Sequence, residues 1–135
     1  MSTPDPKFGP WSIHYQQPWK DEAANPRLPM PLRVTFLALG NHRANGHANF
    51  RQQEVANALG RYDDSGTWVL ADRRTVYRAI AQAIEWKLLE AGSRAMCLIV
   101  PKHRATGGPG DENEPCKRHP AGELASDMRR LKVVK

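Results

Sequence analysis

The stretch from Asp72 to Leu88 constrains the fold of this chain more than any other. Its apolar residues recur at spacings of three and four, as in an amphipathic helix: Val76, Ile80, Ala83, Ile84 and Leu88. Asp72 is a suitable N-cap, because its carboxylate can accept a hydrogen bond from a backbone N–H of the first turn. The opposite side is polar and begins with cations: Arg74, Tyr77, Arg78, Gln82 and Glu85. The sequence therefore predicts a helix with one side in a core and a polar side facing outward.

Size and composition predict a single small domain. The chain has 135 residues, and its 11 prolines and 10 glycines indicate irregular segments around one core. The net charge of +6 favours a polyanionic partner, nucleic acid first and an acidic protein surface second. No apolar run is long enough to span a membrane, and no signal peptide follows Met1. We therefore expect a cytoplasmic protein with no membrane partner.

The first 27 residues form a segment rich in proline and aromatic residues. Its five prolines exclude a long helix, so we expect an extended N-terminal arm over residues 1–27. One or both of Trp11 and Trp19 should be buried against the domain or a partner subunit. Lys7 and Lys20 leave open a contact between this arm and a phosphate or a minor groove.

Residues 28–101 are predicted to form the folded domain. A first helix should begin at Pro29-Met30-Pro31, since proline is tolerated in a first turn, and should end near Gly40-Asn41. A very short strand at 48–50 precedes a second helix over Arg51–Leu59. Residues 61–71 are predicted to be a loop that Trp68 holds against the body.

Two further segments follow the predicted helix at 72–88. Leu89–Ala91, the turn Gly92–Arg94 and Ala95–Val100 predict a β-hairpin, with the second strand better buried. Residues 102–135 are predicted to be a flexible linker and a basic C-terminal tail, with a short helix over 121–134.

The order helix, short strand, helix, helix and hairpin resembles that of winged helix–turn–helix DNA-binding proteins. The residues that carry the resemblance are Leu32–Leu39, Phe50–Gly60, Arg73–Ile80 and Leu88–Val100. With Gly46–Phe50, the Leu98–Pro101 strand and the Cys116–Pro120 tail, the chain is similar to small helix–turn–helix regulators of actinobacterial phages. The resemblance implies a mainly α fold with a small β-hairpin (α+β). The chain departs from this pattern at 61–71, where such regulators need only a short turn.

The resemblance also implies a function, namely sequence-specific binding of double-stranded DNA by a phage or prophage regulator that occupies its operator. The residues that would face the major groove are Arg73, Arg74, Tyr77, Arg78 and Gln82. Thr75 and Gln52 or Gln53 would contact phosphates, and Arg94 at the wing tip would reach the backbone or minor groove. Such proteins commonly form homodimers, here through the N-terminal arm or the Leu124–Leu131 helix. The expected location is the bacterial host cytoplasm, at the nucleoid.

A different class of function stays open, in which the same fold binds a host polymerase or replication protein. Tyr62, Trp68 and Trp86 are candidate anchors, because interface hot spots favour such residues. Core packing is the competing explanation for Trp86 and Trp68. The salt dependence of duplex binding separates the two classes.

The cysteines and several of the histidines are candidate metal ligands. Cys97 and Cys116 do not form the pattern of a disulfide framework, and Cys116-x-x-His119 has half the spacing of a zinc site. Two further ligands would have to come from His103, His47, His42, Cys97 or a second chain. Cys97 also fits the role of a small buried apolar residue. We expect no cofactor, with zinc at Cys116 and His119 as the open alternative.

Motifs that would indicate an enzyme were not found. His42, Asn45, His47 and Asn49 gather in one turn but lack the acidic or metal-binding partners of a His-Asn-His nuclease. The sequence contains no nucleophile elbow, phosphate-binding loop or dinucleotide fingerprint. We therefore expect a binding protein.

Overall fold

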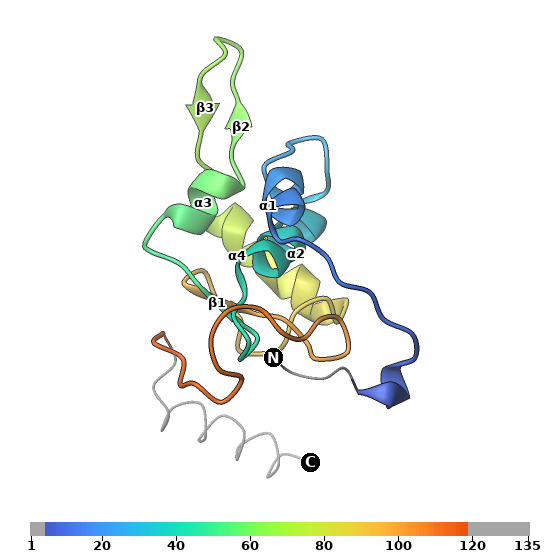
Figure 1. Cartoon of the computed structure of the whole chain (residues 1–135). Coiled ribbons are helices and arrows are strands. Elements are labelled where there is room, and N and C mark those ends of the chain that lie inside the picture. The colour runs from blue at the N-terminus through green and yellow to red at the C-terminus, as the bar shows by residue number, and fades with distance from the viewer. Residues whose placement is uncertain (1–4, 119–135) are drawn as a thin grey trace.

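The computed structural model describes residues 5–118, which form a mixed α+β fold of helices and two small antiparallel sheets (Figure 1). The elements in chain order are η1 Pro6–Phe8, α1 Gln17–Ala23, α2 Met30–Asn41, β1 His47–Asn49, α3 Glu54–Ala58, β2 Arg61–Tyr62, β3 Trp68–Val69, α4 Arg73–Glu85 and β4 Cys97–Ile99. The helix expected at 121–134 lies outside the described residues.

Helix α2 is central to the fold, and it begins in the predicted Pro29-Met30-Pro31 segment. It packs against α1 and α4 and also contacts β1 and α3. Gly40 allows α1 to approach closely, since an added Cβ would lie 2.9 Å from the backbone nitrogen of Lys20. The core around α2 is apolar and includes Val34, Leu37, Ala38, Phe50, Val55, Leu59, Val76, Ile80, Leu89 and Leu98.

The N-terminal segment is not wholly extended as expected, because residues 17–23 form α1. The Gln16 amide donates to the carbonyl oxygens of Leu39 and His42 at 3.1 and 3.0 Å, which ties the start of α1 to the end of α2. The Trp19 ring is half-buried, 5.2 Å from that of Phe36. Trp11 is 63% exposed, so one tryptophan of the segment packs on the domain and the other does not.

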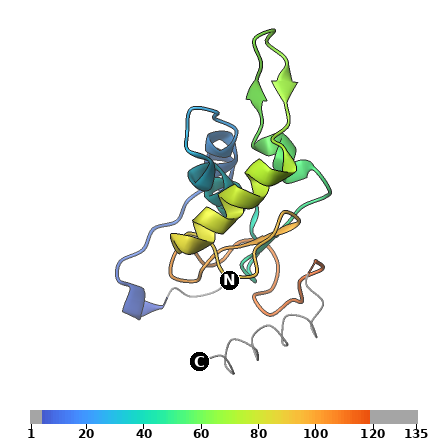
Figure 2. The same cartoon turned by 180° about the vertical axis from the view of Figure 1, so that it is seen from behind.

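Helix α4 forms where the sequence predicts it, with Asp72 as N-cap. Figure 2 shows it lying across one side of the molecule. It ends at Glu85, earlier than the expected Leu88. Lys87 has φ +62°, and the amides of Lys87 and Leu88 bond back to Ile84 and Ala83. This Schellman closure is usually made by glycine, so sequence reasoning placed the end too late.

The expected hairpin of 89–91 with 95–100 is wrong in its pairing. Strand β4 pairs with β1 in antiparallel register, with Asn49 opposite Cys97. The stretch 89–91 supplies a backbone bond from Glu90 N–H to the Ile99 oxygen, and Arg94 and Cys97 close a tight turn. The very short strand expected near 48–50 is confirmed as β1, one residue earlier.

The segment between α3 and α4 is a hairpin rather than the expected loop. Strands β2 and β3 pair, and the hairpin projects from α3 well beyond the body (Figures 1 and 2). The Asp63 carboxylate closes its turn by accepting from the amides of Ser65 and Thr67, both at 2.9 Å. The preceding helix α3 is shorter than expected, five residues in place of 51–59, because Gln53 has φ +66°.

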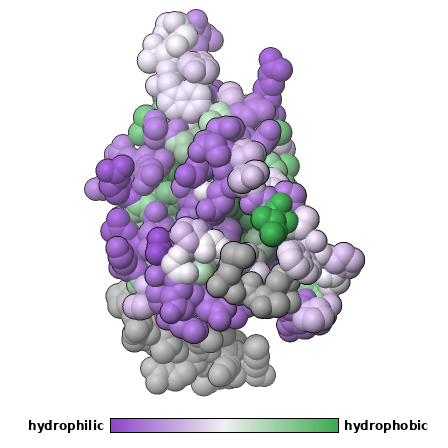
Figure 3. Space-filling model, in the orientation of Figure 1, coloured by the Kyte–Doolittle hydropathy of each residue, from purple (hydrophilic) through white to green (hydrophobic). Residues whose placement is uncertain are grey.

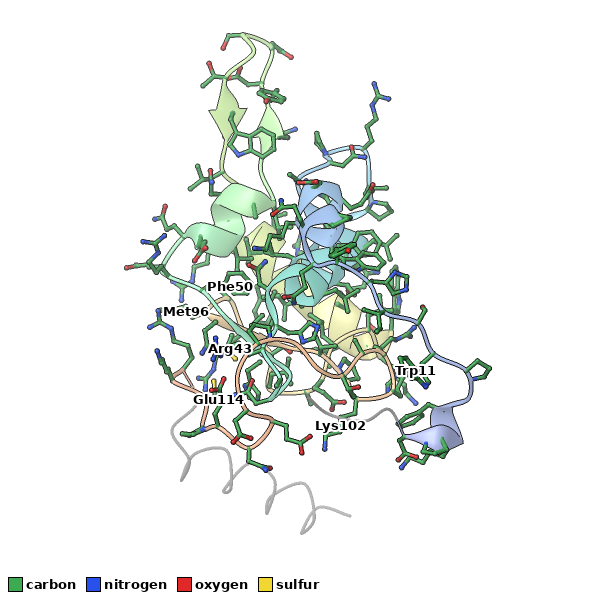
Figure 4. The ribbon with its side chains drawn as sticks, viewed as in Figure 1. Trp11, Arg43, Phe50, Met96, Lys102 and Glu114 are labelled. Carbon is green, nitrogen blue, oxygen red and sulfur yellow. The ribbon has the colours of Figure 1, made fainter. Side chains whose placement is uncertain are left out.

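Residues 102–118, expected to be a flexible linker, fold back against the turn before β1. The Ala44 amide donates to the Pro109 oxygen at 2.8 Å, and Asn45 donates to the Glu114 oxygen at 3.1 Å. Arg43 forms an ion pair with Glu114, and Figure 4 shows these two side chains beside each other. Glu114 therefore pairs with an arginine of the domain instead of remaining solvated.

Candidate nucleic-acid interface

The outward side of α4 carries the residues that the sequence selected for DNA contact. Five of them are exposed: Arg73, Arg74, Tyr77, Arg78 and Gln82. Tyr77 is 73% exposed, whereas Thr75 is half-buried. The helix start is fixed by Asp72, whose carboxylate accepts from the Thr75 amide at 2.7 Å. This bond lowers the pKa of Asp72, so the cap is charged at neutral pH.

These residues form three lines along the helix, because successive residues are about 100° apart. Arg74 and Arg78 lie one turn apart, opposite the buried side of α4. Arg73 and Tyr77 occupy one flank and Gln82 the other. In the described range 5–118, no ion pair involves Arg73, Arg74 or Arg78. Like charges one turn apart repel, so a bound polyanion would reduce the repulsion between Arg74 and Arg78.

A groove of about 870 Å³ runs beside α4, and two other segments with predicted contact residues, at 52–53 and 93–96, also line it. The predicted contact residues that line it are Gln52, Gln53, Arg73, Tyr77 and Arg94. The structure therefore brings together the start of α3, the first turns of α4 and the turn before β4. Arg74, Thr75, Arg78 and Gln82 are not in its lining, and they lie elsewhere on α4. The groove floor is apolar and includes Val55, Val76 and Ile80.

The wall of the groove opposite α4 is the Ser93–Met96 turn. It is held by the Phe50 amide, which donates to the Met96 oxygen at 2.9 Å, and these residues lie side by side in Figure 4. The Ser93 hydroxyl accepts from the Ile99 amide at 2.9 Å. The turn occupies the place of the predicted wing, and Arg94 is exposed on it.

The β2–β3 hairpin is the part of this region that sequence reasoning missed. Tyr62 is 65% exposed and meets Trp68 edge-on at 4.9 Å between ring centroids. The Trp68 indole donates to the Asn57 oxygen at 2.8 Å, which confirms its expected role of holding the segment to the body. Aromatic residues on both sides of the Asp-Ser-Gly turn were the signal for a hairpin. Figure 3 shows the hairpin surface as intermediate in hydropathy, over a largely hydrophilic face.

Trp86 does not pack into the core as expected, since it is 49% exposed at the end of α4. Tyr62 and Trp86 are therefore the exposed aromatic candidates for a protein contact, whereas Trp68 is occupied by the hairpin.

A second cluster joins three of the candidate metal ligands. His47 Nδ1 lies 3.2 Å from the Cys97 sulfur, and the two cysteine sulfurs lie 3.5 Å apart. The ligand atoms of His47, Cys97 and Cys116 all lie within 4.8 Å of one another, so the three residues could hold a metal ion. Cys97 is buried as expected but does not lie among apolar groups alone. The fourth candidate residue, His119, lies outside the described residues.

The other histidines proposed as ligands are not part of this group. His42 Nδ1 lies 3.1 Å from the Arg43 oxygen, and burial lowers the pKa of His42. The His103 ring lies 6.4 Å from that of Phe8. The fold thus selects His47 and Cys97 from the set that the sequence left open.

Comparison with protein-family models, with curated proteins and with solved structures finds no match to this chain. Within residues 5–118, no helix is both long and apolar enough to cross a membrane.

Proposed function

We propose that the protein binds double-stranded DNA with sequence specificity, α4 entering the major groove, and that it acts as a regulator by occupying its operator. The observation that carries the proposal is the exposed Arg74–Arg78 line on a helix anchored by its other side in the core. Arginine is the side chain that most often reads guanine in the major groove, and an α-helix fits that groove.

The order of elements supports a winged helix–turn–helix arrangement with two changes. Helices α2, α3 and α4 supply the three-helix unit, and β1 with β4 supplies a small sheet beside it. The wing is reduced to the Ser93–Met96 turn, and the β2–β3 hairpin is inserted between α3 and α4. In this arrangement Arg94 and the Gln52–Gln53 pair line the groove beside α4 and would contact phosphates next to the bases.

The test begins with selection of bound sequences from a random duplex pool, followed by binding measurements on the selected and on unrelated duplexes. Arg78→Ala should weaken binding to the selected duplex by about 10- to 100-fold, the value of one bidentate base contact, and should change unrelated binding far less. Arg27→Ala is the matched control, because Arg27 is exposed in the segment before α2. Equal losses on both duplexes would make Arg78 a phosphate contact instead.

Salt dependence separates this function from binding to a host protein. DNA binding through several phosphates should weaken steeply and linearly on logarithmic axes as salt rises. A chain that retains no duplex at low salt, or one whose affinity is unchanged in Arg74→Ala and Arg78→Ala, would contradict the proposal. The exposed Tyr62 and Trp86 would then be the residues to test for a protein partner.

A further inference from the structure

One face of the β1–β4 sheet carries polar and sulfur groups where a core sheet normally carries apolar ones. In the antiparallel register His47, Asn49 and Cys97 share this face with one apolar residue, Ile99, because facing residues and alternate residues point the same way. Ala48 and Leu98 point to the opposite face and are fully buried in the core. The segment 102–118 covers the polar face and brings Cys116 onto it, with its sulfur 3.3 Å from Asn49 Oδ1.

The spacing of the ligand atoms fits a tetrahedral metal ion. With Zn–S near 2.3 Å and Zn–N near 2.05 Å, tetrahedral ligands lie about 3.8 Å apart for two sulfurs and about 3.6 Å for sulfur and nitrogen. The structure has 3.5 Å between the cysteine sulfurs and 3.2 Å between His47 Nδ1 and the Cys97 sulfur. The sulfurs are well beyond the ~2.05 Å of a disulfide bond. The ligand atoms of the third pair, His47 and Cys116, lie within 4.8 Å of each other, so small shifts of the three side chains would let them share one ion.

The donor set also selects the metal. Thiolate and imidazole together favour zinc over the oxygen-seeking magnesium and calcium. His47 and Cys97 are buried, which suits a closed structural site rather than an open catalytic one.

We propose that His47, Cys97 and Cys116 bind a structural zinc ion. On binding, both thiols release their protons to solvent, and the two thiolates balance the charge of Zn²⁺.

The ion would fasten the 102–118 segment to the sheet. In the described chain, its other polar ties to the turn before β1 include the Arg43–Glu114 ion pair and the amide bonds to Pro109 and Glu114. These lie at the surface and are individually small contributions. A metal centre that joins β1, β4 and this segment would make all three fold together.

The experiment uses the full chain, purified under reducing conditions from cells grown with zinc. Metal analysis should find one zinc per chain that survives dialysis. Cobalt in place of zinc should give the intense visible absorption of a tetrahedral thiolate site. Cys116→Ser and His47→Ala should each weaken zinc retention against a chelator by on the order of 100-fold. His103→Ala is the control, since His103 is exposed and outside the cluster.

Limited trypsin digestion gives a second readout that does not depend on metal content. Cleavage after Lys102 and Arg104, both exposed in the covering segment, should be slow with zinc and at least about tenfold faster after chelation. Wild-type protein with neither bound zinc nor cobalt absorption would overturn the proposal. So would wild-type zinc retention in Cys116→Ser. A lack of titratable thiols in denatured protein from a separate preparation made without reductant would mean a disulfide, and would also overturn it.

Discussion

The most informative test of the fold is removal of Arg33, a buried cation in the first turn of α2. Its side chain is 1% exposed. The guanidinium donates to the oxygens of Ala23 at 2.9 Å, Ala58 at 3.1 Å, Leu59 at 3.3 Å and Gly60 at 2.8 Å. These oxygens lie at the C-terminal ends of α1 and α3, where helix dipoles are negative. Arg33 therefore fastens both helices to α2.

The cost of replacing Arg33 by methionine can be worked from these bonds. Methionine keeps most of the volume but leaves four carbonyl oxygens without this donor. At about 1 kcal/mol for each, the low end for a buried unsatisfied group, the loss is roughly 4 kcal/mol. Part is returned because a guanidinium no longer has to be desolvated. We expect the free energy of unfolding to fall by about 3 kcal/mol, and the melting temperature by roughly 10 °C.

Urea denaturation followed by circular dichroism measures this change. Arg27→Met is the control, because Arg27 is exposed and its replacement should change the free energy of unfolding by less than about 0.5 kcal/mol. Arg33→Lys should also be destabilising, since a single nitrogen cannot serve carbonyls on two helices. Equal urea midpoints for Arg33→Met and Arg27→Met would show that the buried bonds contribute nothing net, and the reasoning would fail.

Two further substitutions test the N-cap of α4 and the packing at the base of the β2–β3 hairpin. The Thr75 amide lowers the pKa of Asp72, so the carboxylate stabilises the fold above the ordinary carboxyl pKa of about 4, and this contribution is lost as the pH falls through the lowered pKa. Asp72→Ala should therefore lower the urea midpoint at neutral pH. The difference in urea midpoint between this variant and wild type should shrink near pH ~2. A difference that stays constant with pH would exclude a charged cap. Gly60→Ala should cost about 1–3 kcal/mol, because the added Cβ would lie 2.5 Å from both the Val69 oxygen and Trp68 Nε1. An unchanged urea midpoint would mean that the hairpin moves aside freely.

The parts of the fold that the sequence predicted well are those set by neighbours in the chain. The α4 stripe, its Asp72 cap and the proline start of α2 all depend on spacings of a few residues. The start of α3 and the end of α4 were harder to predict, because Gln53 and Lys87 adopt positive φ although neither is glycine. Nothing in a local pattern marks such a residue, since the surrounding packing fixes it.

The pairing of strands and the metal cluster could not be predicted, because they join distant parts of the chain. The strand at 95–100 is predicted to pair with 89–91, yet its ladder forms with β1, which brings Ala48 into the core opposite Leu98. The 89–91 stretch contributes the bond from the Glu90 amide to the Ile99 oxygen, on the other edge of β4. His47 and Cys97 are 50 positions apart. The sequence could name both as candidates together with His42 and His103, but only the sheet register separates the first pair from the rest.

The two proposals meet at β4 and still fail or succeed separately. Cys97 begins this strand, and the preceding Ser93–Met96 turn forms the groove wall that carries Arg94. The Arg74–Arg78 line does not depend on that wall, because α4 is held by Asp72 and by its own apolar side in the core. A protein that binds no metal could therefore still bind DNA through α4. A protein that binds no DNA could still bind zinc at His47, Cys97 and Cys116, so each proposal is judged by its own measurement.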